Sequence, residues 1–299
     1  MNAFVGYALV LLLTPLAAAS KTALVLQTDF GQRDGAVAAM KGVAFGVDSG
    51  LPIFDLSHDN RPFDIWEGAY RLKQTAAYWP AGTVFVSVID PGVGTDRKSV
   101  VLKTKSGHYF VGPDNGTWTL VAEDLGIAEV RRIDEARNRL KGSDRSYTFH
   151  GRDVYAYTGA RLAAGAITFE DVGPLLPAQV VQLAYTKAQR KGEVLEGGVP
   201  QLDVQYGNVW SNIPDSLVAP WAARPGDRFR VRFLRAGKVV FDGVMPFANT
   251  FGEVPAGSPL LYLNSLLNLS VALNQGSFAE KHGIAAGSEW SVQVERAKP

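Results

Sequence analysis

Cysteine is absent from the 299 residues of the chain. The protein therefore has no disulfide bond, no thiol nucleophile and no thiolate metal ligand. Its four histidines show neither His-x-x-x-His nor His-x-His spacing, which is the kind of spacing that histidine-built metal sites use. We therefore expect a site that contains no metal ion.

An excess of charge of either sign is also missing. The 30 basic residues nearly balance the 29 acidic ones, the formal net charge is +1 at pH 7, and no basic run stands out. Nucleic-acid-binding proteins usually carry a basic patch, so we expect no nucleic acid partner. No Gly-x-Gly-x-x-Gly fingerprint follows the first predicted strand, and no Gly-x-Ser-x-Gly elbow occurs. These absences argue against a dinucleotide-binding fold and against a serine hydrolase.

A long hydrophobic run stands at the start of the chain. Phe4 to Leu16 is almost entirely apolar and is followed by Ala17-Ala18-Ala19-Ser20. The pattern predicts a signal peptide at residues 1–19, cleaved after Ala19, although no Lys or Arg precedes it. About 13 apolar residues are too few to cross a bilayer core of ~30 Å, so a membrane anchor or a buried helix is the weaker interpretation.

The signal peptide predicts an exported protein. We expect a periplasmic or secreted location, with no stable membrane association after cleavage. A cytoplasmic location is the alternative, since the segment before the apolar run lacks the usual positive charge.

Residues 20–176 alternate short apolar runs with amphipathic segments. The helical segments include one that Asp64 begins, with Glu67 three positions later as in a capping box, and the charged span 134–145 is expected to be solvated. Strands are expected at residues 23–27, 52–56, 83–88, 99–102, 109–112 and 129–133. The alternation predicts an α/β N-terminal domain with a mostly parallel sheet flanked by helices.

The remainder of the chain has a different pattern. We place a linker at residues 177–192, after the sequence Gly173-Pro174-Leu175-Leu176-Pro177. Short strand-like runs follow at residues 199–204, 229–234, 238–241, 260–263 and 290–294. Gly, Pro, Asn and Asp separate these runs, which predicts a smaller, mainly antiparallel, barrel-like β domain over residues 193–299.

One loop of the first domain combines opposite charges at the end of a strand. The strand at 83–88 leads into Ile89-Asp90-Pro91-Gly92-Val93-Gly94-Thr95-Asp96-Arg97. Ligands of α/β sheets bind beyond the carboxyl ends of the strands, and Asp29 and His150 also stand at predicted strand ends or loops. Asp-Pro-Gly is also ordinary turn chemistry, so these residues alone indicate only a ligand-binding α/β protein.

The motifs together resemble the S-adenosylmethionine hydroxide adenosyltransferase family, which is related to the S-adenosylmethionine halogenases. They occur in the expected order over almost the whole chain after the apolar run. The matching segments are Thr28-Asp29-Phe30-Gly31, His58-Asp59-Asn60-Arg61-Pro62-Phe63, Asp90 to Arg97, Gly112-Pro113-Asp114-Asn115-Gly116, Thr148-Phe149-His150-Gly151-Arg152-Asp153, Tyr206-Gly207-Asn208-Val209-Trp210-Ser211-Asn212 and Leu261-Tyr262-Leu263-Asn264-Ser265.

The resemblance implies hydrolysis of S-adenosylmethionine to adenosine and methionine, with no cofactor. Its catalytic Asp, Arg and His correspond to Asp90, Arg97 and His150. The leaving group is a neutral thioether, so the requirement is an oriented water in line with the ribose 5′-carbon. Arg97 and His150 would orient that water and stabilise developing negative charge, and Asp90 would accept a proton or fix the hydrogen bonds.

The resemblance also implies a set of substrate-binding residues. Asp29 would bind both ribose hydroxyls, Asp34 would lie near the methionine amine, and Ser265 would lie near its carboxylate. The other expected contacts to ribose and adenine are Phe63, Phe149, Gly151, Tyr206, Asn208 and Phe251. Aromatic rings suit a flat base, but any of these rings could equally be an ordinary core residue. For Asp34 the alternative role is a helix cap, and for Ser265 it is a hydroxyl group in a turn.

In the family that the chain resembles, the site lies between the first domain of one subunit and the second domain of its neighbour, within a trimer. A homotrimer is therefore expected. Halide transfer is a rival activity, but the halogenases are expected to lack the Asp, Arg and His set that this chain keeps, and to carry an extra loop after Arg97. A non-catalytic, exported protein that binds adenosyl compounds is the other alternative. Export keeps it open, because S-adenosylmethionine is expected in the cytoplasm.

Overall fold

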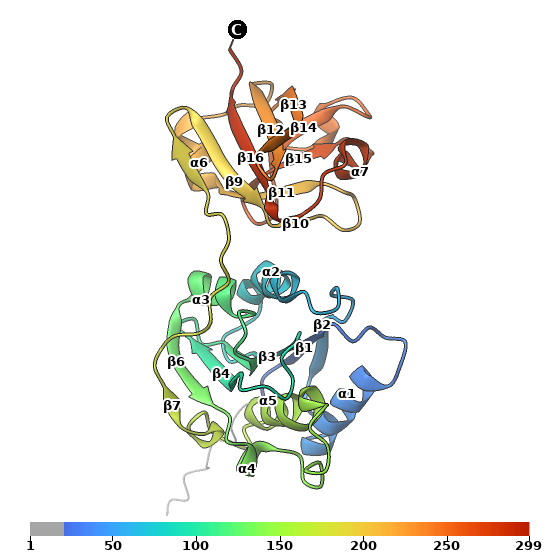
Figure 1. The fold of residues 1–299 in the computed structure, drawn as a ribbon, viewed down its shortest axis with the longest axis vertical. Coiled ribbons are helices and arrows are strands. Elements are labelled where there is room, and N and C mark those ends of the chain that lie inside the picture. Colours follow the sequence, from blue (N-terminus) through green and yellow to red (C-terminus); the bar gives the residue numbers. More distant parts are fainter. Residues whose placement is uncertain (1–20, 299) are drawn as a thin grey trace, which may run out of the picture.

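The computed structural model describes residues 21–298. The signal peptide predicted at residues 1–19 lies outside the described residues. The chain forms an N-terminal domain built on one sheet and a C-terminal domain of strands, and an extended segment joins them (Figure 1).

Seven strands form the first sheet, in the order β2-β1-β3-β5-β4-β6-β7. Neighbours among β2, β1, β3 and β5 are parallel, whereas β4 is antiparallel to β5 and β6, and β7 to β6. The connection between β4 and β5, residues 105–108, is too short for the crossover that a parallel pair needs. The bounds are β1 (Leu24–Thr28), β2 (Ile53–Ser57), β3 (Val84–Val88), β4 (Ser99–Thr104), β5 (Tyr109–Pro113), β6 (Ile127–Arg132) and β7 (Leu175–Leu176).

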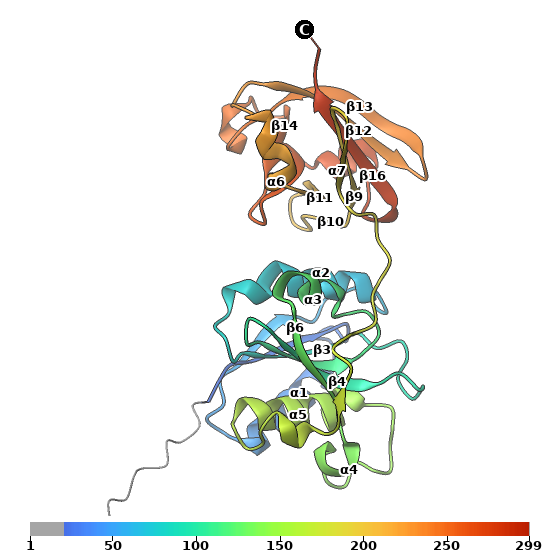
Figure 2. The same cartoon turned by 90° about the vertical axis from the view of Figure 1, so that its left-hand side faces the viewer.

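Helices cover both faces of this sheet (Figure 2). Phe85 and Val86 are neighbours in β3 and point to opposite faces. Val86 packs in a core with Met40 of α1, and Phe85 packs in another core with Leu72 of α2. The helices on one face are α1 (Ala36–Val47), the π-helical turn η2 (Gly151–Ala156) and α5 (Tyr157–Ala163), and those on the other are α2 (Ile65–Thr75) and α3 (Thr119–Leu125). The predicted α/β class is confirmed.

The predicted cap at Asp64 is confirmed, because its Oδ1 accepts a hydrogen bond from the N–H of Glu67 at 2.9 Å. The Glu67 side chain differs from a capping box: its Oε2 accepts the N–H of Arg61 at 2.9 Å. The start of α2 therefore also fixes the loop before it. The remaining short helical turns of this domain are η1 (Ala76–Tyr78), α4 (Glu135–Asn138) and η3 (Glu170–Val172).

Two antiparallel sheets form the C-terminal domain, in the orders β10-β11-β15-β14 and β13-β12-β16-β9-β8. Both contribute to one core, in which Val209 and Leu261 pack with Phe229 and Val292. The strands are β8 (Gln189–Lys191), β9 (Val194–Val199), β10 (Gln201–Leu202), β11 (Val209–Pro214), β12 (Arg228–Arg235), β13 (Lys238–Pro246), β14 (Pro259–Leu263), β15 (Asn268–Leu273) and β16 (Gly287–Arg296). The helical turns are α6 (Asp215–Val218), η4 (Ala219–Trp221), η5 (Phe251–Glu253) and α7 (Phe278–His282).

The two domains contact each other through the α2 and α3 side of the first sheet. Trp66 of α2 donates a hydrogen bond from Nε1 to the carbonyl oxygen of Pro200 at 2.9 Å. Trp210 of β11 is buried in one apolar cluster with Tyr70 and Leu120. This contact leaves the loops at the carboxyl ends of β1 and β3 outside the apolar cluster.

Over residues 21–298, no helix combines the length and the apolar character that crossing a membrane requires.

Candidate active site

The loop after β3 carries Asp90 on a fixed turn. Ile89 is fully buried, and its carbonyl oxygen accepts a hydrogen bond from Nδ2 of Asn115 at 2.8 Å. The N–H of Thr95 and its hydroxyl both donate to the carbonyl oxygen of Gly92, at 3.0 and 2.7 Å. Gly94 adopts φ +82, a left-handed conformation that favours glycine. The glycine turn therefore brings the start of β4 back beside the end of β3.

Arg97 and Asp90 form a close ion pair across this turn. Nε of Arg97 lies 3.0 Å from each carboxylate oxygen of Asp90, and Nη2 lies 2.6 Å from Oδ2. The side chain of Arg97 is only 10% exposed and that of Asp90 only 5%. A planar guanidinium that contacts both oxygens of a carboxylate has a defined orientation, so the pair is a rigid unit.

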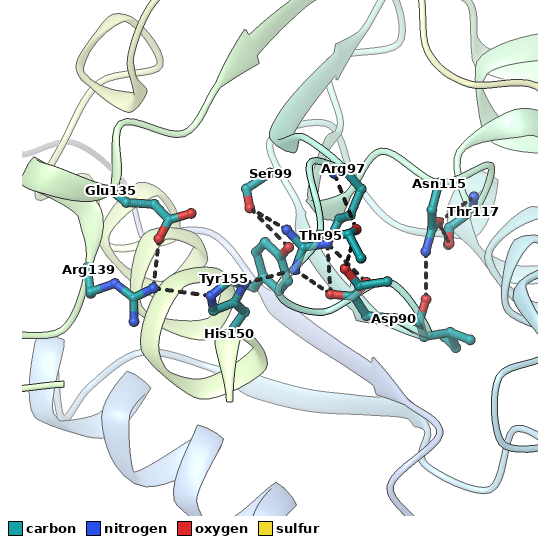
Figure 3. A network of polar contacts seen from close by, with 12 residues as sticks. Asp90, Thr95, Arg97, Ser99, Asn115, Thr117, Glu135, Arg139, His150 and Tyr155 are labelled. Carbon is teal, nitrogen blue, oxygen red and sulfur yellow. Dashed lines mark hydrogen bonds and ion pairs between the residues drawn. The ribbon is translucent and has the colours of Figure 1, made fainter. Parts of the chain in front are cut away.

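His150 completes the group that the motifs predict. Arg97 Nη2 lies 2.8 Å from Nδ1 of His150, which is 7% exposed and stands directly before η2 (Figure 3). Residues some fifty positions apart in sequence are therefore in direct contact. A π-helical turn within a longer helix is common at functional sites, and here it begins at the residue after His150.

The surroundings of His150 favour its neutral form. Burial lowers the pKa of His150, and the positive charges of Arg97 and Arg139 lower it further, against the opposing effects of Glu135 and Asp90. The two ring nitrogens face guanidinium groups, Nδ1 towards Arg97 and Nε2 towards Arg139 at 3.2 Å. Because an imidazolium has two N–H donors and no acceptor, protonation would set donor against donor on both sides.

Two hydroxyl groups support Arg97 from behind. Arg97 Nη1 donates to Oγ of Ser99 at 3.2 Å, and Ser99 Oγ lies 3.1 Å from the hydroxyl of Tyr155. The guanidinium also lies over the Tyr155 ring, 5.7 Å from its centroid. Burial raises the pKa of Tyr155, which keeps its hydroxyl protonated and able to donate. Neither Ser99 nor Tyr155 belongs to the motifs from which the site residues were predicted.

Asp29 lies in the loop after β1 and holds the loop after β2. Its Oδ2 accepts the N–H of Phe63 at 2.8 Å, and Phe63 adopts φ +67, which is rare for a residue with a side chain. The Thr28 hydroxyl lies 2.8 Å from Nδ1 of His58, and the carbonyl oxygen of His58 accepts the N–H of Gly31 at 2.8 Å. Two loops that match motifs of the sequence are thus tied together.

The carboxyl group of Asp29 titrates above its ordinary range. Burial raises the pKa of Asp29 and the nearby charge of Asp90 adds to this, although the hydrogen bond from the N–H of Phe63 lowers it. The ring of Phe63 is 71% exposed. Residues in such rarely populated backbone conformations cluster at active sites and ligand-binding segments.

Phe149 and Gly151 stand on either side of His150. Phe149 meets Phe30 edge to face, with the ring centroids 5.7 Å apart. A Cβ atom on Gly151 would lie 3.3 Å from the Phe30 ring and 3.2 Å from Val88. The segment before η2 therefore packs directly against the end of β3 and against the residue after Asp29. These contacts bring Asp29 and His150 to the same edge of the sheet.

Asp34 is exposed, and its Oδ1 accepts the N–H of Ala36 at 2.9 Å, at the start of α1. The N-cap residue of α1 is Gly35, so Asp34 binds the first N–H of the helix from one position before the cap. The contact leaves Oδ2 open to solvent or a ligand.

The predicted binding residues of the second domain lie apart from this group. Tyr206 is 67% exposed and Phe251 43% exposed, whereas Asn208 is buried and donates from Nδ2 to Asp203 at 3.1 Å. Ser265 lies in the β14–β15 turn, and its carbonyl oxygen is 3.5 Å from the Tyr78 hydroxyl. Within residues 21–298, no hydrogen bond joins these side chains to Asp90, Arg97 or His150 of the same chain.

A polar cavity of about 590 Å³ adjoins the charged group, and Arg97 and His150 are part of its wall. Its other lining residues include Ser99, Arg132 and Glu135. Among residues 21–298, no group of three His, Asp or Glu side chains could hold a metal ion. The arrangement suits the orientation of a small polar molecule such as water.

Fold and site together define a two-domain α/β protein with a small-molecule site at the carboxyl ends of parallel strands. The chain belongs to the SAM hydroxide adenosyltransferase family. The model of the family's N-terminal domain matches residues 24–173, and that of its C-terminal domain matches residues 197–291.

Three relatives illustrate the family. A protein of Salinispora tropica named (R)-S-adenosyl-L-methionine hydrolase is 36% identical, with 89% of this chain and 95% of the relative covered. A Methanocaldococcus jannaschii protein of the same name is 49% identical, but only 46% of this chain and 52% of that relative are covered. A protein of Actinoplanes sp. named fluorinase is 29% identical, with 88% of this chain and 95% of the relative covered.

A solved structure has the same fold. The crystal structure of an uncharacterized conserved protein from Thermotoga maritima superposes with a TM-score of 0.84 at 33% identity, and the match covers 91% of this chain and 100% of the other. The similarity extends over both domains.

Proposed function

We propose that the protein hydrolyses S-adenosylmethionine to adenosine and methionine. Membership of the family supports this, as do the similar proteins that carry the hydrolase name. The observation that carries the proposal is the direct contact of Arg97 with both Asp90 and His150 in a buried arrangement.

The reaction needs a positioned nucleophile more than it needs an acid. Water oxygen bonds to the 5′-carbon of the ribose while the bond from that carbon to sulfur breaks. The electron pair of the broken bond remains on sulfur, so the sulfonium becomes the neutral thioether of methionine, and one proton leaves the water. Holding water in line for such an attack can lower the barrier by ~7–11 kcal/mol.

Arg97 and His150 orient the water in this proposal. A neutral His150 has one ring nitrogen that accepts a hydrogen bond and one that donates. Its position between two guanidinium groups opposes a second proton, so His150 does not serve as the proton acceptor. The guanidinium of Arg97 stabilises the negative charge that develops on the water oxygen.

Asp90 fixes Arg97 and offers the remaining acceptor. A carboxylate has about four lone-pair sites, and the hydrogen bonds from Arg97 use Oδ2 more fully than Oδ1. Oδ1 can therefore accept a hydrogen bond from the water or take its proton. General-base assistance of this kind typically contributes about 10²–10⁴-fold.

Asp29 binds the ribose hydroxyls in this proposal. A carboxylate accepts two hydrogen bonds at once and donates none, and Asp29 lies at the same edge of the sheet as His150 through the Phe30 and Phe149 contact. Phe63 and Gly151 line the ribose, and Asp34 lies near the methionine amine.

The second domain completes the site from a neighbouring subunit of a homotrimer. The exposed Tyr206 and Phe251 rings and the turn at Ser265 suit contacts to adenine and the methionine carboxylate, whereas the buried Asn208 supports the shape of its loop. A site divided between subunits explains why substrate motifs occur in both domains although these residues make no contact with the charged group of their own chain.

An exported enzyme would be separated from S-adenosylmethionine in the cytoplasm. Under the predicted signal peptide, the enzyme acts in the periplasm or outside the cell on adenosyl compounds released there. Binding without turnover is the second candidate function, and halide transfer is less favoured because the chain keeps Asp90, Arg97 and His150.

The deciding experiment incubates the mature protein with S-adenosylmethionine in ¹⁸O-labelled water and analyses the products by mass spectrometry. We expect the label in the 5′-hydroxyl of adenosine, together with an equal amount of methionine. Binding of unchanged substrate would favour the non-catalytic alternative. A 5′-halogenated adenosine formed in the presence of a halide salt would favour the halogenase.

A further inference from the structure

A second arginine contacts His150 from the side opposite Arg97. Arg139 follows α4 directly, and its Nη2 lies 3.2 Å from Nε2 of His150. The same Nη2 donates to Oε2 of Glu135 at 2.7 Å. Figure 3 shows the resulting line of contacts, from Glu135 through Arg139 and His150 to Arg97 and Asp90.

The placement of Arg139 is unusual for a structural arginine. Its side chain is only 9% exposed, and its Nη1 is buried without a hydrogen-bond partner among residues 21–298. The guanidinium also stacks on the Tyr147 ring, 4.7 Å from the centroid. A buried donor without a partner costs stability, and the fold offers no compensating bond, which points to a role in the adjoining site.

The imidazole of His150 cannot bond to both arginines at once. A neutral ring has a single acceptor nitrogen, and the contact with Arg97 is the shorter one, at 2.8 Å. Arg97 is also fixed by Asp90, so it keeps the hydrogen bond to Nδ1. The second cation, Arg139, therefore faces the N–H of Nε2, and its positive charge opposes the addition of a second proton to the ring.

We infer that Arg139 is a positioning residue for the reaction, which together with Arg97 brackets His150 and holds its ring neutral and fixed in place. Glu135 in turn holds Arg139. The inference rests on the proposed function and extends it to a residue outside the Asp90, Arg97 and His150 group. Arg139 acts through His150 and does not touch the reacting atoms.

The protonation of His150 depends on all the charged and titratable groups around its ring. Asp90 and Arg97 face His150 from the loop after β3. Glu135 of α4 and Arg139, the residue after α4, face it from the other side. Tyr155 lies in η2, and the centroid of its ring is 6.3 Å from that of the His150 ring. Arg97 and Arg139 lower the pKa of His150, whereas Glu135 and Asp90 raise it. Substitutions at residues 135 and 139 should therefore shift the titration of His150 in opposite directions.

The test measures the His150 ring titration by NMR in the mature, full-length protein, and kcat and KM against pH in parallel. We expect Arg139→Met to move the titration and the acid limb of kcat to higher pH, and to lower kcat by about 10- to 100-fold with little change in KM. Glu135→Gln should move the titration to lower pH. Arg139→Lys keeps the charge and should restore the wild-type titration.

The matched control is Arg137→Met, two residues earlier in α4, because Arg137 is exposed and its Nη2 contacts Asp171, away from His150. An unchanged titration and an unchanged kcat in Arg139→Met would overturn the inference. If Arg139→Met does not fold, Glu135→Gln and Arg139→Lys decide the matter: the first should move the titration to lower pH, and the second should leave it unchanged. If the wild-type protein does not hydrolyse S-adenosylmethionine, the proposed function fails, and the NMR titrations still test the bracketing of His150.

Discussion

Arg97 and Asp90 are joined by three contacts of 2.6–3.0 Å, and the Nη2 atom that makes the shortest of them also lies 2.8 Å from His150. One nitrogen atom therefore links the carboxylate to the imidazole. The orientation of each group depends on the planar shape of the guanidinium and not only on its charge. An ammonium group of the same charge cannot reproduce this geometry, because it has no fixed fork of donors.

Arg97→Lys should consequently lower kcat by about 10²–10³-fold while KM changes by less than about threefold. The variant keeps the positive charge but loses the simultaneous contacts with Asp90 and His150. Initial rates of adenosine formation measured by chromatography give both parameters. The control is Arg235→Lys, because Arg235 pairs with Glu289 on the surface of the second domain. A raised KM with an unchanged kcat would assign Arg97 to substrate binding and remove it from the catalytic group.

Tyr155→Phe should destabilise the protein by about 1 kcal/mol. The substitution removes the hydroxyl that lies 3.1 Å from Ser99, in a site where Tyr155 is fully buried. Ser99 then supports Arg97 with one partner fewer, so a modest loss of kcat is expected as well. Urea unfolding followed by circular dichroism measures the stability. Tyr157→Phe is the control, since the Tyr157 hydroxyl has no hydrogen bond within residues 21–298, and equal stability of the two variants would show that the Tyr155 hydroxyl is dispensable.

The fold was largely predictable because its local signals agree with its tertiary structure. The strands β1 and β3, which Asp29 and Asp90 follow, are short apolar runs bounded by turn residues. The cap at Asp64 is a contact between residues close in sequence. The strands β9, β11 and β15 were not predicted as such. All six residues of β15 are buried, yet the segment includes Asn268 and Ser270, and its strand conformation depends on pairing with β11 and β14.

The site was predictable only in part. The motifs indicated Asp90, Arg97 and His150, which the fold brings into contact. The prediction that residues 134–145 are solvated was wrong for Asn138, which is buried, and for Arg139, which is nearly so. A Glu and an Arg four positions apart usually form an exposed pair on a helix. Nothing local to residues 135 and 139 shows that His150 lies beside them, because that contact depends on the packing of η2.

Asp29→Asn should raise KM by about 10- to 100-fold at neutral pH, because hydrogen bonds to a charged acceptor contribute ~1.5–3 kcal/mol. The pKa of Asp29 is raised by burial, so its protonation begins at a higher pH than for an exposed Asp. Since the ionised form binds the ribose, KM of the wild type should rise as the pH falls through that raised pKa. The Asn variant, which does not ionise, should lack this limb of the profile.

The control for this prediction is Asp48→Asn, at a partly exposed position where the carboxylate pairs with Lys21. It should show the wild-type pH dependence of KM. A pH-dependent KM that is the same in Asp29→Asn as in the wild type would assign the acid limb to another group and remove Asp29 as the ribose ligand.

A trimer with divided sites predicts that two inactive variants restore each other. His150→Ala inactivates the first-domain half of a site, and the double substitution Tyr206→Ala and Phe251→Ala inactivates the second-domain half. In trimers that contain both chains at random and in equal amounts, about one quarter of the sites combine two intact halves. Co-expressed variants should therefore recover about a quarter of the wild-type kcat, whereas each variant expressed alone stays inactive.

Light scattering on the purified mixture determines whether the mass corresponds to three chains. A control mixture of His150→Ala with Arg97→Lys should show no recovery, because both substitutions lie in the first-domain half and no pairing of chains yields an intact site. A site contained within one chain would give no recovery in either mixture, since every chain then carries a defect in its own site. Recovery in the first mixture alone therefore requires that the exposed Tyr206 and Phe251 rings act on the Asp90, Arg97 and His150 group of a different subunit.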